Sequence, residues 1–382
     1  MIMRRTFLLF SIAAALTTSF SACLKEPVDD GPGPGAGKTT YTYNWPAIAD
    51  SSYSSLISGF YNQGGKYFNE NNTGKQDFHY WRNAHALDVL TDAYLRTGAA
   101  AVKTRMDDLL EGMKAKNGNT YINHYYDDME WMVLACLRAY EATSDDKYKA
   151  TAELIWSDIK GGWDDTWGGG IYWNKDRRNK NTPANAPAAI IAARMYQLNR
   201  NAEDLEWAKK IYQWQKNYLV DPVSGLVWDG LDDTGTNKDW KFTYNQGVFI
   251  GAGVELYKIT GQQVYLSDAV KAANNSLGGD FTSGNIFKDE GGGDGGLFKG
   301  ILVRYLMLLI TDGNLSSTDA AKYINSLELN AQTMWLQGTS RPQIIFSSSW
   351  TKVGTSTDLS IQLSGAMLIE AAAKLKRLEL ID

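Results

Sequence analysis

Apolar residues recur at helical spacing along most of the chain, from residue 46 to residue 377. They return every three or four positions, and Gly, Pro, Asn and Asp residues mark where each run ends. This period predicts a chain of α-helices joined by turns and loops. The predicted helices span residues 46–62, 81–96, 100–114, 126–142, 146–158, 185–199, 202–219, 244–259, 262–276, 297–310, 317–336 and 358–377.

The connections between these helices alternate between long and short. Because successive antiparallel helices reverse direction, every long connection falls at one end of the assembly and every short one at the other. One end is therefore expected to carry elaborate loops. The long connections are 63–80, 115–125, 159–184, 220–243, 277–296 and 337–357, and the short ones are 97–99, 143–145, 200–201, 260–261 and 311–316.

The second helix of each pair is apolar on more than one side, as residues 132–137 and 301–303 show. A helix that is apolar all round is a buried helix. Six buried helices surrounded by six amphipathic ones predict an all-α (α/α)6 toroid of six inner and six outer helices in a single domain. A straight solenoid of helix pairs shares the alternation, but the sequence lacks the recurring consensus typical of solenoids.

The N-terminus has the features of a bacterial export signal. Arg4 and Arg5 precede an apolar stretch at residues 7–16, which is too short to span a bilayer, and Cys23 follows small residues that resemble a lipobox. An ordinary cleaved signal with an incidental Cys is the alternative. We expect a lipid-anchored protein at the bacterial cell envelope, on the outer membrane and facing outward. The predicted parts are a lipoprotein signal peptide at 1–22, a Pro/Gly-rich spacer at 23–44 after lipidated Cys23, and a catalytic domain at 45–382.

Charge and histidine content narrow the classes of function. The 38 Lys and Arg residues face 43 Asp and Glu residues, and no basic stripe is present that could hold a phosphate backbone, so no nucleic-acid partner is expected. His79, His85 and His124 show no metal-binding spacing, and the acidic segment 229–239 lacks the calcium-loop pattern. We therefore expect no metal and no cofactor.

An aspartate pair at the start of a predicted inner helix is the main candidate for chemistry. Asp127 and Asp128 diverge by about 100° as neighbouring helix positions, so they could flank a ligand bond. Retaining glycosidases need two carboxyl groups about 5 to 5.5 Å apart, one as nucleophile and one as acid/base. Burial and mutual repulsion would raise one pKa, while the helix N-terminus would favour the ionised partner. The alternative is a solvated pair of the kind seen at Asp107 and Asp108.

Aromatic residues in the long connections favour a sugar site, because Trp and Tyr faces cover the apolar faces of pyranose rings. Each Trp alone could pack beneath a loop, but the group indicates a groove. Asp294, within the GGGDGG run at 291–296, would face that groove, or the glycines could simply permit a tight loop. The tryptophans concerned are Trp163, Trp167, Trp173, Trp228, Trp240 and Trp350.

Several stretches in the same order resemble glycoside hydrolase family 76, the endo-acting α-1,6-mannanases. The most specific is YYDDMEW at 125–131, and the others are GGGIYWN (168–174), KNTPANAPAAIIAARMY (180–196), TYNQGVFIGAGVELY (243–257) and FKGILVRYL (298–306). The resemblance implies an (α/α)6 fold and a metal-independent retaining mechanism with Asp127 as nucleophile and Asp128 as general acid/base. Glu130 stands where a small apolar residue is expected in many relatives.

The resemblance implies a retaining endo-acting hydrolase that cleaves α-1,6-mannosidic linkages of a mannan backbone through a covalent mannosyl-enzyme intermediate. The expected partner is α-1,6-mannan or a manno-oligosaccharide, with membrane contact only through the lipid, and the protein is expected to be a monomer. A transglycosylase acting on mannose chains and a non-catalytic glycan-binding protein are the alternatives, and the intact Asp pair argues against the second. The expected substrate-binding residues are Trp81, Tyr126, Trp173, Asn174, Trp228, Tyr244, Asn245, Gln246, Asp294 and Lys299.

Overall fold

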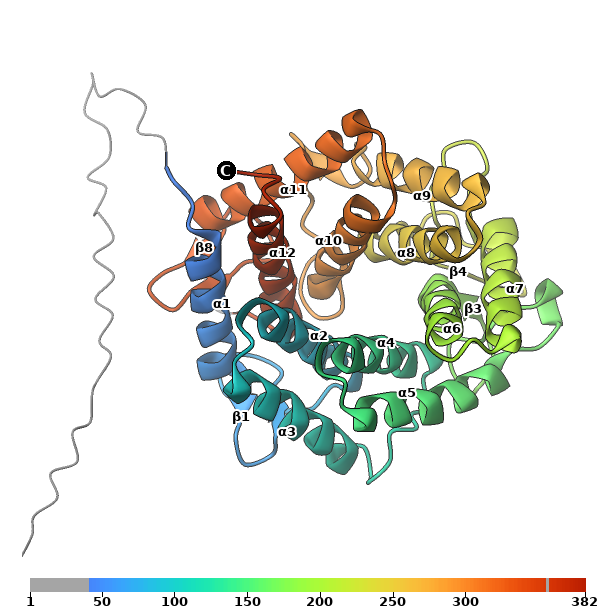
Figure 1. The fold of residues 1–382 in the computed structure, drawn as a ribbon, viewed down its shortest axis with the longest axis horizontal. Helices are drawn as coiled ribbons and strands as arrows, with labels where there is room; N and C mark the ends of the chain where they lie inside the picture. Colours follow the sequence, from blue (N-terminus) through green and yellow to red (C-terminus); the bar gives the residue numbers. More distant parts are fainter. Residues whose placement is uncertain (1–40, 355–356) are drawn as a thin grey trace, which may run out of the picture. The chain divides into compact units, whose positions relative to one another are not determined.

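A computed structural model describes residues 41–354 and 357–382, and Tyr43–Asp382 form one compact unit (Figure 1). The signal peptide, Cys23 and most of the spacer lie outside the described residues. The described residues contain twelve α-helices, each within two residues of its predicted bounds. They are α1 (Trp45–Phe60), α2 (Tyr80–Thr97), α3 (Ala100–Lys116), α4 (Tyr126–Thr143), α5 (Asp146–Ile159), α6 (Ala186–Asn199), α7 (Ala202–Leu219), α8 (Thr243–Thr260), α9 (Gln263–Ser276), α10 (Gly295–Asp312), α11 (Ser317–Gln337) and α12 (Leu359–Arg377).

The even-numbered helices form a closed inner ring. Each packs against the next in the order α2, α4, α6, α8, α10 and α12, and α12 returns to pack against α2. The odd-numbered helices lie outside, with α3 on α2, α5 on α4 and so on, while α1 covers α12 (Figure 1). The predicted (α/α)6 toroid is confirmed, and the contact between α12 and α2 excludes the open solenoid.

The division into inner and outer helices follows from how much of each helix is apolar. In α8, every residue from Thr243 to Leu256 is buried, whereas α9 buries only one face. Gly247 lets α8 and α10 approach closely, since a Cβ there would lie 2.8 Å from Leu302 Cα. Within the described part of the chain, no helix combines the length and apolar character that crossing a membrane requires.

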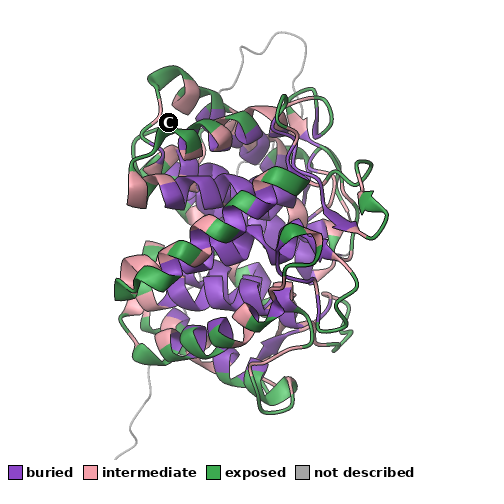
Figure 2. Cartoon of the chain, turned by 90° about the vertical axis from the view of Figure 1, so that its right-hand side faces the viewer, coloured by how far each residue is buried: buried purple, intermediate pink, exposed green. Residues whose placement is uncertain are grey.

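The long connections gather at one end of the ring and the short turns at the other (Figure 2). The sequence pattern predicted these connections only as loops, but they contain short antiparallel strands. Segments of two or three residues are too short to reveal the alternation that identifies a strand. The strands are β1 (Tyr61–Asn62), β2 (Tyr67–Phe68), β3 (Lys180–Asn181), β4 (Gly230–Asp232), β5 (Gly235–Thr236), β6 (Thr282–Ser283), β7 (Ile286–Phe287), β8 (Thr339–Ser340) and β9 (Ile345–Phe346), paired as β1–β2, β3–β4–β5, β6–β7 and β8–β9.

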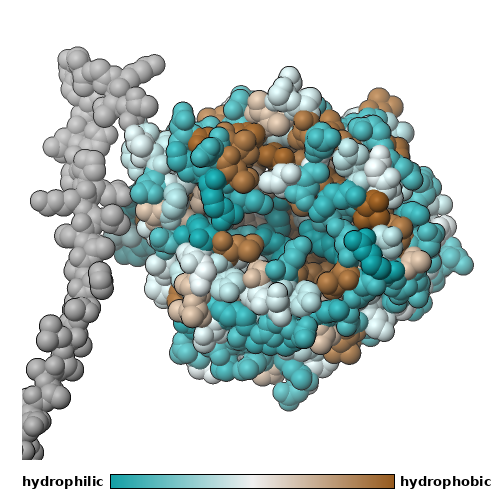
Figure 3. All heavy atoms as spheres, viewed as in Figure 1, coloured by the Kyte–Doolittle hydropathy of each residue, from teal (hydrophilic) through white to brown (hydrophobic). Residues whose placement is uncertain are grey.

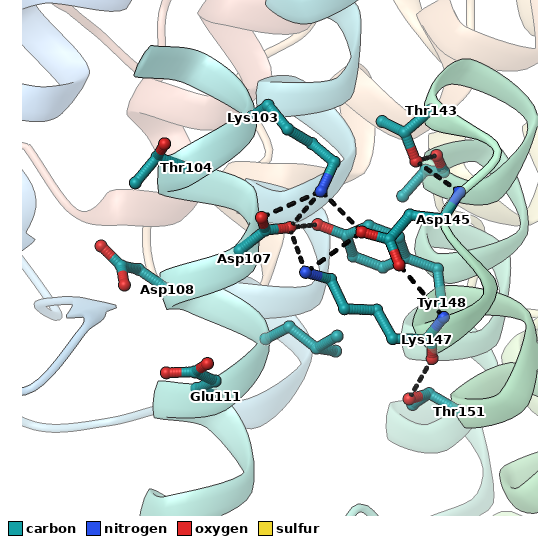
Figure 4. A network of polar contacts seen from close by, with 12 residues as sticks. Lys103, Thr104, Asp107, Asp108, Glu111, Thr143, Asp145, Lys147, Tyr148 and Thr151 are labelled. Atoms are coloured by element: carbon teal, nitrogen blue, oxygen red, sulfur yellow. Dashed lines mark hydrogen bonds and ion pairs between the residues drawn. The ribbon is translucent and has the colours of Figure 1, made fainter. Parts of the chain in front are cut away.

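An ion-pair network joins the outer helices α3 and α5 (Figure 4). Lys103 Nζ lies 2.6 Å from Asp107 Oδ1 and 2.8 Å from Asp145 Oδ2. Lys147 contacts the same two carboxylates, and the Tyr148 hydroxyl donates to Asp107. Because Asp145 also caps α5 by accepting from the Lys147 amide, the network fixes the turn at which α5 begins.

A second network crosses the interior of the ring near the short turns. Arg138 of α4 contacts Asp88 and Asp92 of α2, with its Nη2 2.5 Å from Asp92 Oδ1. Arg304 of α10 reaches the same two residues, with Nε 2.7 Å from Asp88 Oδ2 and Nη2 3.0 Å from Asp92 Oδ2. All four carboxylate oxygens therefore contact a guanidinium, and three inner helices are held together through charges.

We expect Asp92→Asn to destabilise the fold in a pH-dependent way. Burial raises the Asp92 pKa, but Arg138 and Arg304 outweigh it and lower the pKa to about 2. Since this pKa is depressed by folding, the stabilisation is complete above about pH 4 and is lost as the pH falls towards 2. Urea denaturation at pH 7 should show a free energy of unfolding lower by about 3 kcal/mol, because a buried pair loses one partner.

The matched control is Asp77→Asn, which removes an exposed carboxylate 3.1 Å from Lys75 Nζ. This variant should change the free energy of unfolding little, because exposed ion pairs contribute little. The structural role of the network would be contradicted if Asp92→Asn lowered the free energy of unfolding no more than Asp77→Asn does. It would also be contradicted if the effect of Asp92→Asn on that free energy were as large near pH 2 as at pH 7.

Candidate active site

A cleft of about 1240 Å³ opens at the end of the ring that carries the long connections. The first turns of the inner helices α2, α4, α8 and α10 form its floor, and β4 and β5 with the turn that follows them form one wall. The lining residues that bear on its chemistry are Trp81, Arg82, Asp127, Asp128, Trp131, Trp173, Asp229, Trp240, Tyr244, Asp294 and Phe298.

Asp127 and Asp128 lie in the first turn of α4, half-buried at the cleft floor. The α5–α6 connection fixes this helix start, because the Tyr126 amide donates to the Trp173 carbonyl at 2.9 Å and Tyr125 pairs with Asn174 in a β-bridge. The pair is neither covered by packed side chains nor placed at the end with the short turns. A ligand in the cleft can therefore reach both carboxyl groups.

The two carboxyl groups have different hydrogen-bond partners. The Trp173 indole N–H donates to Asp127 Oδ2 at 2.9 Å, and the Asp128 amide donates to Asp127 Oδ1 at 2.9 Å. Burial raises the Asp127 pKa to about 7, while these two bonds restrain the rise because they favour the ionised form. Burial and the Asp127 charge raise the Asp128 pKa well above its ordinary value. Asp127 is therefore the group that ionises first.

A chain of charges borders Asp128. Arg82 of α2 donates from Nη1 to Glu70 Oε1 at 2.7 Å and from Nη2 to Asp294 Oδ1 at 3.0 Å. Arg82 is buried, whereas the Asp294 carboxylate is largely exposed to the cleft. Arg82 lowers and Asp294 raises the pKa of Asp128, so their opposite effects partly cancel. Glu70 and Arg82 were not predicted as site residues, because only the fold brings them to Asp294.

Asp229 is a third carboxyl group in the cleft. It is buried and accepts from the Tyr244 hydroxyl at 2.8 Å and from Asn245 Nδ2 at 2.9 Å, and burial raises its pKa. The sequence analysis noted Asp229 only within an acidic segment. Its polar partners at the start of α8 were the available signal, but nothing in the sequence joined them to Asp229.

The aromatic side chains of the cleft lie at different depths. Trp131 is buried at the floor, Trp81 and Trp173 are half-buried, and Trp240 at the wall is 56% exposed. The Tyr244 ring stacks on Phe298 with 4.0 Å between centroids. Trp81, Trp173, Tyr244 and Asp294 are thus brought together with the aspartate pair. Trp131, which packs against His85, was not predicted as a site residue, although it follows the aspartate pair by three and four positions and so lies on the same side of α4.

Six of the residues predicted to bind substrate do not line the cleft. The amide of Asn245 is committed to Asp229, and Gln246 bonds the Val227 backbone in both directions. Lys299 donates to the Ser348 carbonyl and is 1% exposed. These side chains support the walls from behind, since their polar atoms are used within the protein. The six are Tyr126, Asn174, Trp228, Asn245, Gln246 and Lys299.

The other three are also held by local contacts. Tyr126 is buried against the backbone of Gly162, where a Cβ would lie 2.9 Å from its ring. Asn174 Oδ1 accepts from the Asp176 amide, so it shapes the turn after Trp173. Trp228 packs with Leu226 and Phe281 in a small separate core. These three residues pack against the segments behind the cleft and do not line it.

Glu130 lies one helical turn below Asp127 and is fully buried. No donor among the described residues makes a hydrogen bond of ordinary geometry to either carboxyl oxygen. Burial and the Asp127 charge raise the Glu130 pKa well above its ordinary value, against a smaller opposing effect of the Ala188 backbone. A neutral Glu130 leaves the charge of Asp127 unopposed by a second carboxylate. Glu130 therefore does not compete with Asp127 for the negative charge.

The arrangement provides one carboxylate and one carboxylic acid at the same cleft floor near neutral pH. Across residues 41–354 and 357–382, no three His, Cys, Asp or Glu side chains are grouped so that they could hold a metal ion. Aromatic faces and polar groups surround the acid pair, as carbohydrate sites require. The chemistry available is acid/base and nucleophilic catalysis by carboxyl groups.

Two solved structures with this fold match most of the chain at 35% identity or more. The α-1,6-mannanase GH76A from Salegentibacter sp. HEL1_6 is 44% identical, with 87% of this chain and 100% of that chain covered and a TM-score of 0.85. An inactive variant of that enzyme, with two consecutive aspartates replaced by alanine, is known in complex with α-1,6-mannotetrose. The Lin0763 protein from Listeria innocua is 35% identical over 88% of this chain and 99% of its own, with a TM-score of 0.81.

The curated relatives are fungal. A putative mannan endo-1,6-alpha-mannosidase from Schizosaccharomyces pombe is 27% identical over 263 residues, which is 60% of this chain and 58% of the relative. The chain spans about half the length of the curated relatives it matches. The family model described as glycosyl hydrolase family 76 matches residues 46–377, almost the whole helical ring. The chain belongs to glycosyl hydrolase family 76.

Proposed function

We propose that this protein is a retaining endo-acting glycoside hydrolase that cleaves α-1,6-mannosidic linkages in mannan. The observation that carries the proposal is the placement of Asp127 and Asp128 together at the floor of an open, aromatic-lined cleft. The cleft is bordered by loops rather than closed over, and an open cleft suits the interior of a polymer chain.

In the proposed mechanism, Asp127 attacks the anomeric carbon while the glycosidic C–O bond breaks. Asp128 gives its proton to the departing oxygen, and a covalent mannosyl-enzyme ester forms. Asp128, now ionised, takes a proton from water as the water oxygen attacks the same carbon, which frees the sugar and restores Asp127. The hydrogen bonds decide which aspartate is the nucleophile and which is the acid. Two N–H donors favour the ionised form of Asp127, whereas no described residue donates a hydrogen bond to the Asp128 carboxyl.

The relatives support the substrate and the catalytic pair. The Salegentibacter enzyme, which this chain covers from end to end, is an α-1,6-mannanase, and replacement of two consecutive aspartates gives an inactive variant of it. The matched fungal proteins are mannan endo-1,6-alpha-mannosidases. A purely glycan-binding role is disfavoured, because binding does not need two acids with such different environments.

The test is incubation with unbranched α-1,6-mannan, followed by sizing of the products. Wild type should release short manno-oligosaccharides of retained anomeric configuration, seen by proton NMR early in the reaction. Asp128→Asn should lower turnover by about 10²- to 10⁴-fold and Asp127→Asn by at least as much, with unchanged melting temperatures. Near wild-type turnover in either variant would contradict the catalytic role proposed for that aspartate. A product of inverted anomeric configuration would exclude the covalent intermediate.

Trp173→Phe should move the acidic limb of the pH profile of kcat/KM upward. The substitution removes an N–H donor that favours ionised Asp127, so the Asp127 pKa rises further. Because Asp127 must be ionised to attack, activity should be lost at a pH higher by about one unit. Trp81→Phe is the control, since Trp81 lines the same cleft without a bond to Asp127. An unshifted limb in Trp173→Phe would show that the indole only shapes the wall.

We also propose lipidation at Cys23 and attachment to the outer membrane, facing outward. The support is the sequence alone: two arginines, an apolar stretch and a lipobox-like Cys. Membrane fractions of cells expressing the full chain should contain the wild type, and mass spectrometry should find acyl groups on Cys23. Cys23→Ser should appear in the soluble or secreted fraction. Retention of this variant in the membrane fraction would contradict the anchor.

A further inference from the structure

Two groups of charged side chains join inner helices of the ring. One lies towards the face with the short turns, which Figure 3 shows hollowed at its middle, and there all four carboxylate oxygens of Asp88 and Asp92 contact a guanidinium. The other borders the cleft at the opposite end and consists of Glu70, Arg82 and Asp294. The second group differs from the first because one carboxylate oxygen of Asp294 has no hydrogen-bond donor among the described residues.

Arg82 is a buried side chain that holds both carboxylates of the cleft group. Its guanidinium donates from Nη1 to Glu70 Oε1 at 2.7 Å and from Nη2 to Asp294 Oδ1 at 3.0 Å. The side chains of Arg82 and Glu70 are 6% and 11% exposed, and His79 contacts the other carboxylate oxygen of Glu70. Because Glu70 is held from both sides, the Arg82 guanidinium has little freedom to turn away from Asp294.

The glycine-rich loop before α10 fixes the backbone next to Asp294. The Gly293 amide donates to Asp358 Oδ2 at 2.8 Å, directly before α12, and a Cβ at Gly292 would lie 2.9 Å from the same oxygen. Gly291 and Gly293 have φ angles of 85° and 59°, which favour glycine. The glycines therefore permit a tight loop and at the same time place Asp294 in the cleft.

The side chain of Asp294 is the exposed member of the cleft group. It is 67% exposed, it lines the cleft, and among the described residues only Arg82 donates to it. That bond uses Oδ1, so Oδ2 is left to accept a hydrogen bond from a ligand. The bond to a buried guanidinium restricts the rotation of this carboxylate, which lowers the entropy lost when a ligand binds.

The position of Asp294 relative to the aspartate pair indicates which sugar it contacts. Trp173 of the α5–α6 connection donates to Asp127, and the next helix position, Asp128, is turned from it by about 100°. Burial and the charges of Asp127 and Asp294 raise the pKa of Asp128. Burial and the charge of Asp229 raise the pKa of Asp127. Asp294 therefore lies on the side of Asp128, which in the proposed mechanism gives its proton to the departing oxygen.

We propose that Asp294 binds a hydroxyl group of the mannose on the leaving-group side of the scissile bond, and that Arg82 is the positioning residue that holds it there. This inference rests on the proposed function, since the proposed cleavage defines which mannose leaves. Asp294 Oδ2 accepts a hydrogen bond from the hydroxyl, and Glu70 keeps the Arg82 guanidinium directed at Asp294. The leaving sugar is thereby held beside Asp128 while the glycosidic oxygen receives its proton.

The test compares two substrates in wild type and Asp294→Ala. α-1,6-Mannotetraose has a mannose as its leaving group, whereas α-1,6-mannobiosyl fluoride has fluoride, which offers no hydroxyl. In Asp294→Ala, the ratio of kcat/KM for the tetraose to kcat/KM for the fluoride, measured at each pH optimum, should fall about 10- to 100-fold, because a hydrogen bond to a charged group is lost. The basic limb of the pH profile for the tetraose should also move to lower pH, because a charge that raises the Asp128 pKa is removed.

The matched control is Asp233→Ala, which removes an exposed carboxylate of the same cleft that has no bond to Arg82 and should keep the wild-type ratio. Arg82→Lys keeps the charge but lacks the fork that reaches Glu70 and Asp294 together, so it should lower the ratio. Adding Asp294→Ala to Arg82→Lys should lower the ratio no further than Asp294→Ala alone, because Arg82 acts through Asp294. If Arg82→Lys folds poorly, Arg82→Gln with Glu70→Gln, which replaces the buried ion pair by neutral side chains, is used instead.

Two results would overturn the inference while the proposed function stands. An unchanged ratio in Asp294→Ala would overturn the contact with the leaving sugar. A wild-type ratio in Arg82→Lys, or losses of the two single variants that add in the double variant, would overturn the positioning role of Arg82. Hydrolysis of neither substrate by wild type would overturn the proposed function and this inference with it.

Discussion

Closure of the inner ring is the constraint on which the rest of the structure depends. Because α12 packs against α2, six antiparallel helix pairs must fit around one axis, and each inner helix begins at the same end. Small residues make that fit close, as at Gly247 beside Leu302. Each inner helix of the closed ring packs against two neighbouring inner helices. The long connections therefore lie outside the ring of helices, at the end where the inner helices begin. The geometry thereby assigns one end to chemistry before any side chain is considered.

The catalytic candidates and the structural ion pairs lie at different levels of the inner helices. Asp127, Asp128 and Asp294 lie at helix starts, whereas Arg138 and Arg304 lie in the later turns of their helices. This arrangement agrees with the helix dipoles at the starts, where anions are favoured. Arg138 and Arg304 lie before the last turns, where the helix dipole has little effect, and they join three inner helices by pairing with the carboxylates of α2. The charges of the proposed active site and those of the structural network therefore come from different turns of the same inner helices.

The sequence was sufficient to predict the helices, the ring and the depth of the aspartate pair, because all three follow from local periodicity and from alternating loop lengths. It was insufficient for contacts between distant segments. Asn245 and Gln246 stand at a helix start like Asp127, yet their amides serve Asp229 and the Val227 backbone, which come from the preceding connection. Arg82, Glu70 and Asp294 meet only because the ring closes. A polar residue at the start of an inner helix is therefore predicted to lie near the site. Whether its side chain can bind a ligand depends on whether its polar atoms already form hydrogen bonds within the protein.

Two chemically identical neighbours acquire different roles because their surroundings differ. Burial alone would raise both pKa values and leave two neutral acids, which could not form a nucleophile at neutral pH. The indole of Trp173 and the Asp128 amide donate to Asp127 and not to the Asp128 carboxyl, so Asp127 is the group that ionises. The negative charge on Asp127 in turn raises the Asp128 pKa and keeps Asp128 protonated. A neutral Glu130 beneath the pair preserves this division, since an ionised one would push the charge off Asp127. The Trp173 indole and the Asp128 amide thus make Asp127 the nucleophile and Asp128 the acid. Because Trp173 belongs to the α5–α6 connection, the position of that connection matters for the proposed reaction as much as the position of α4.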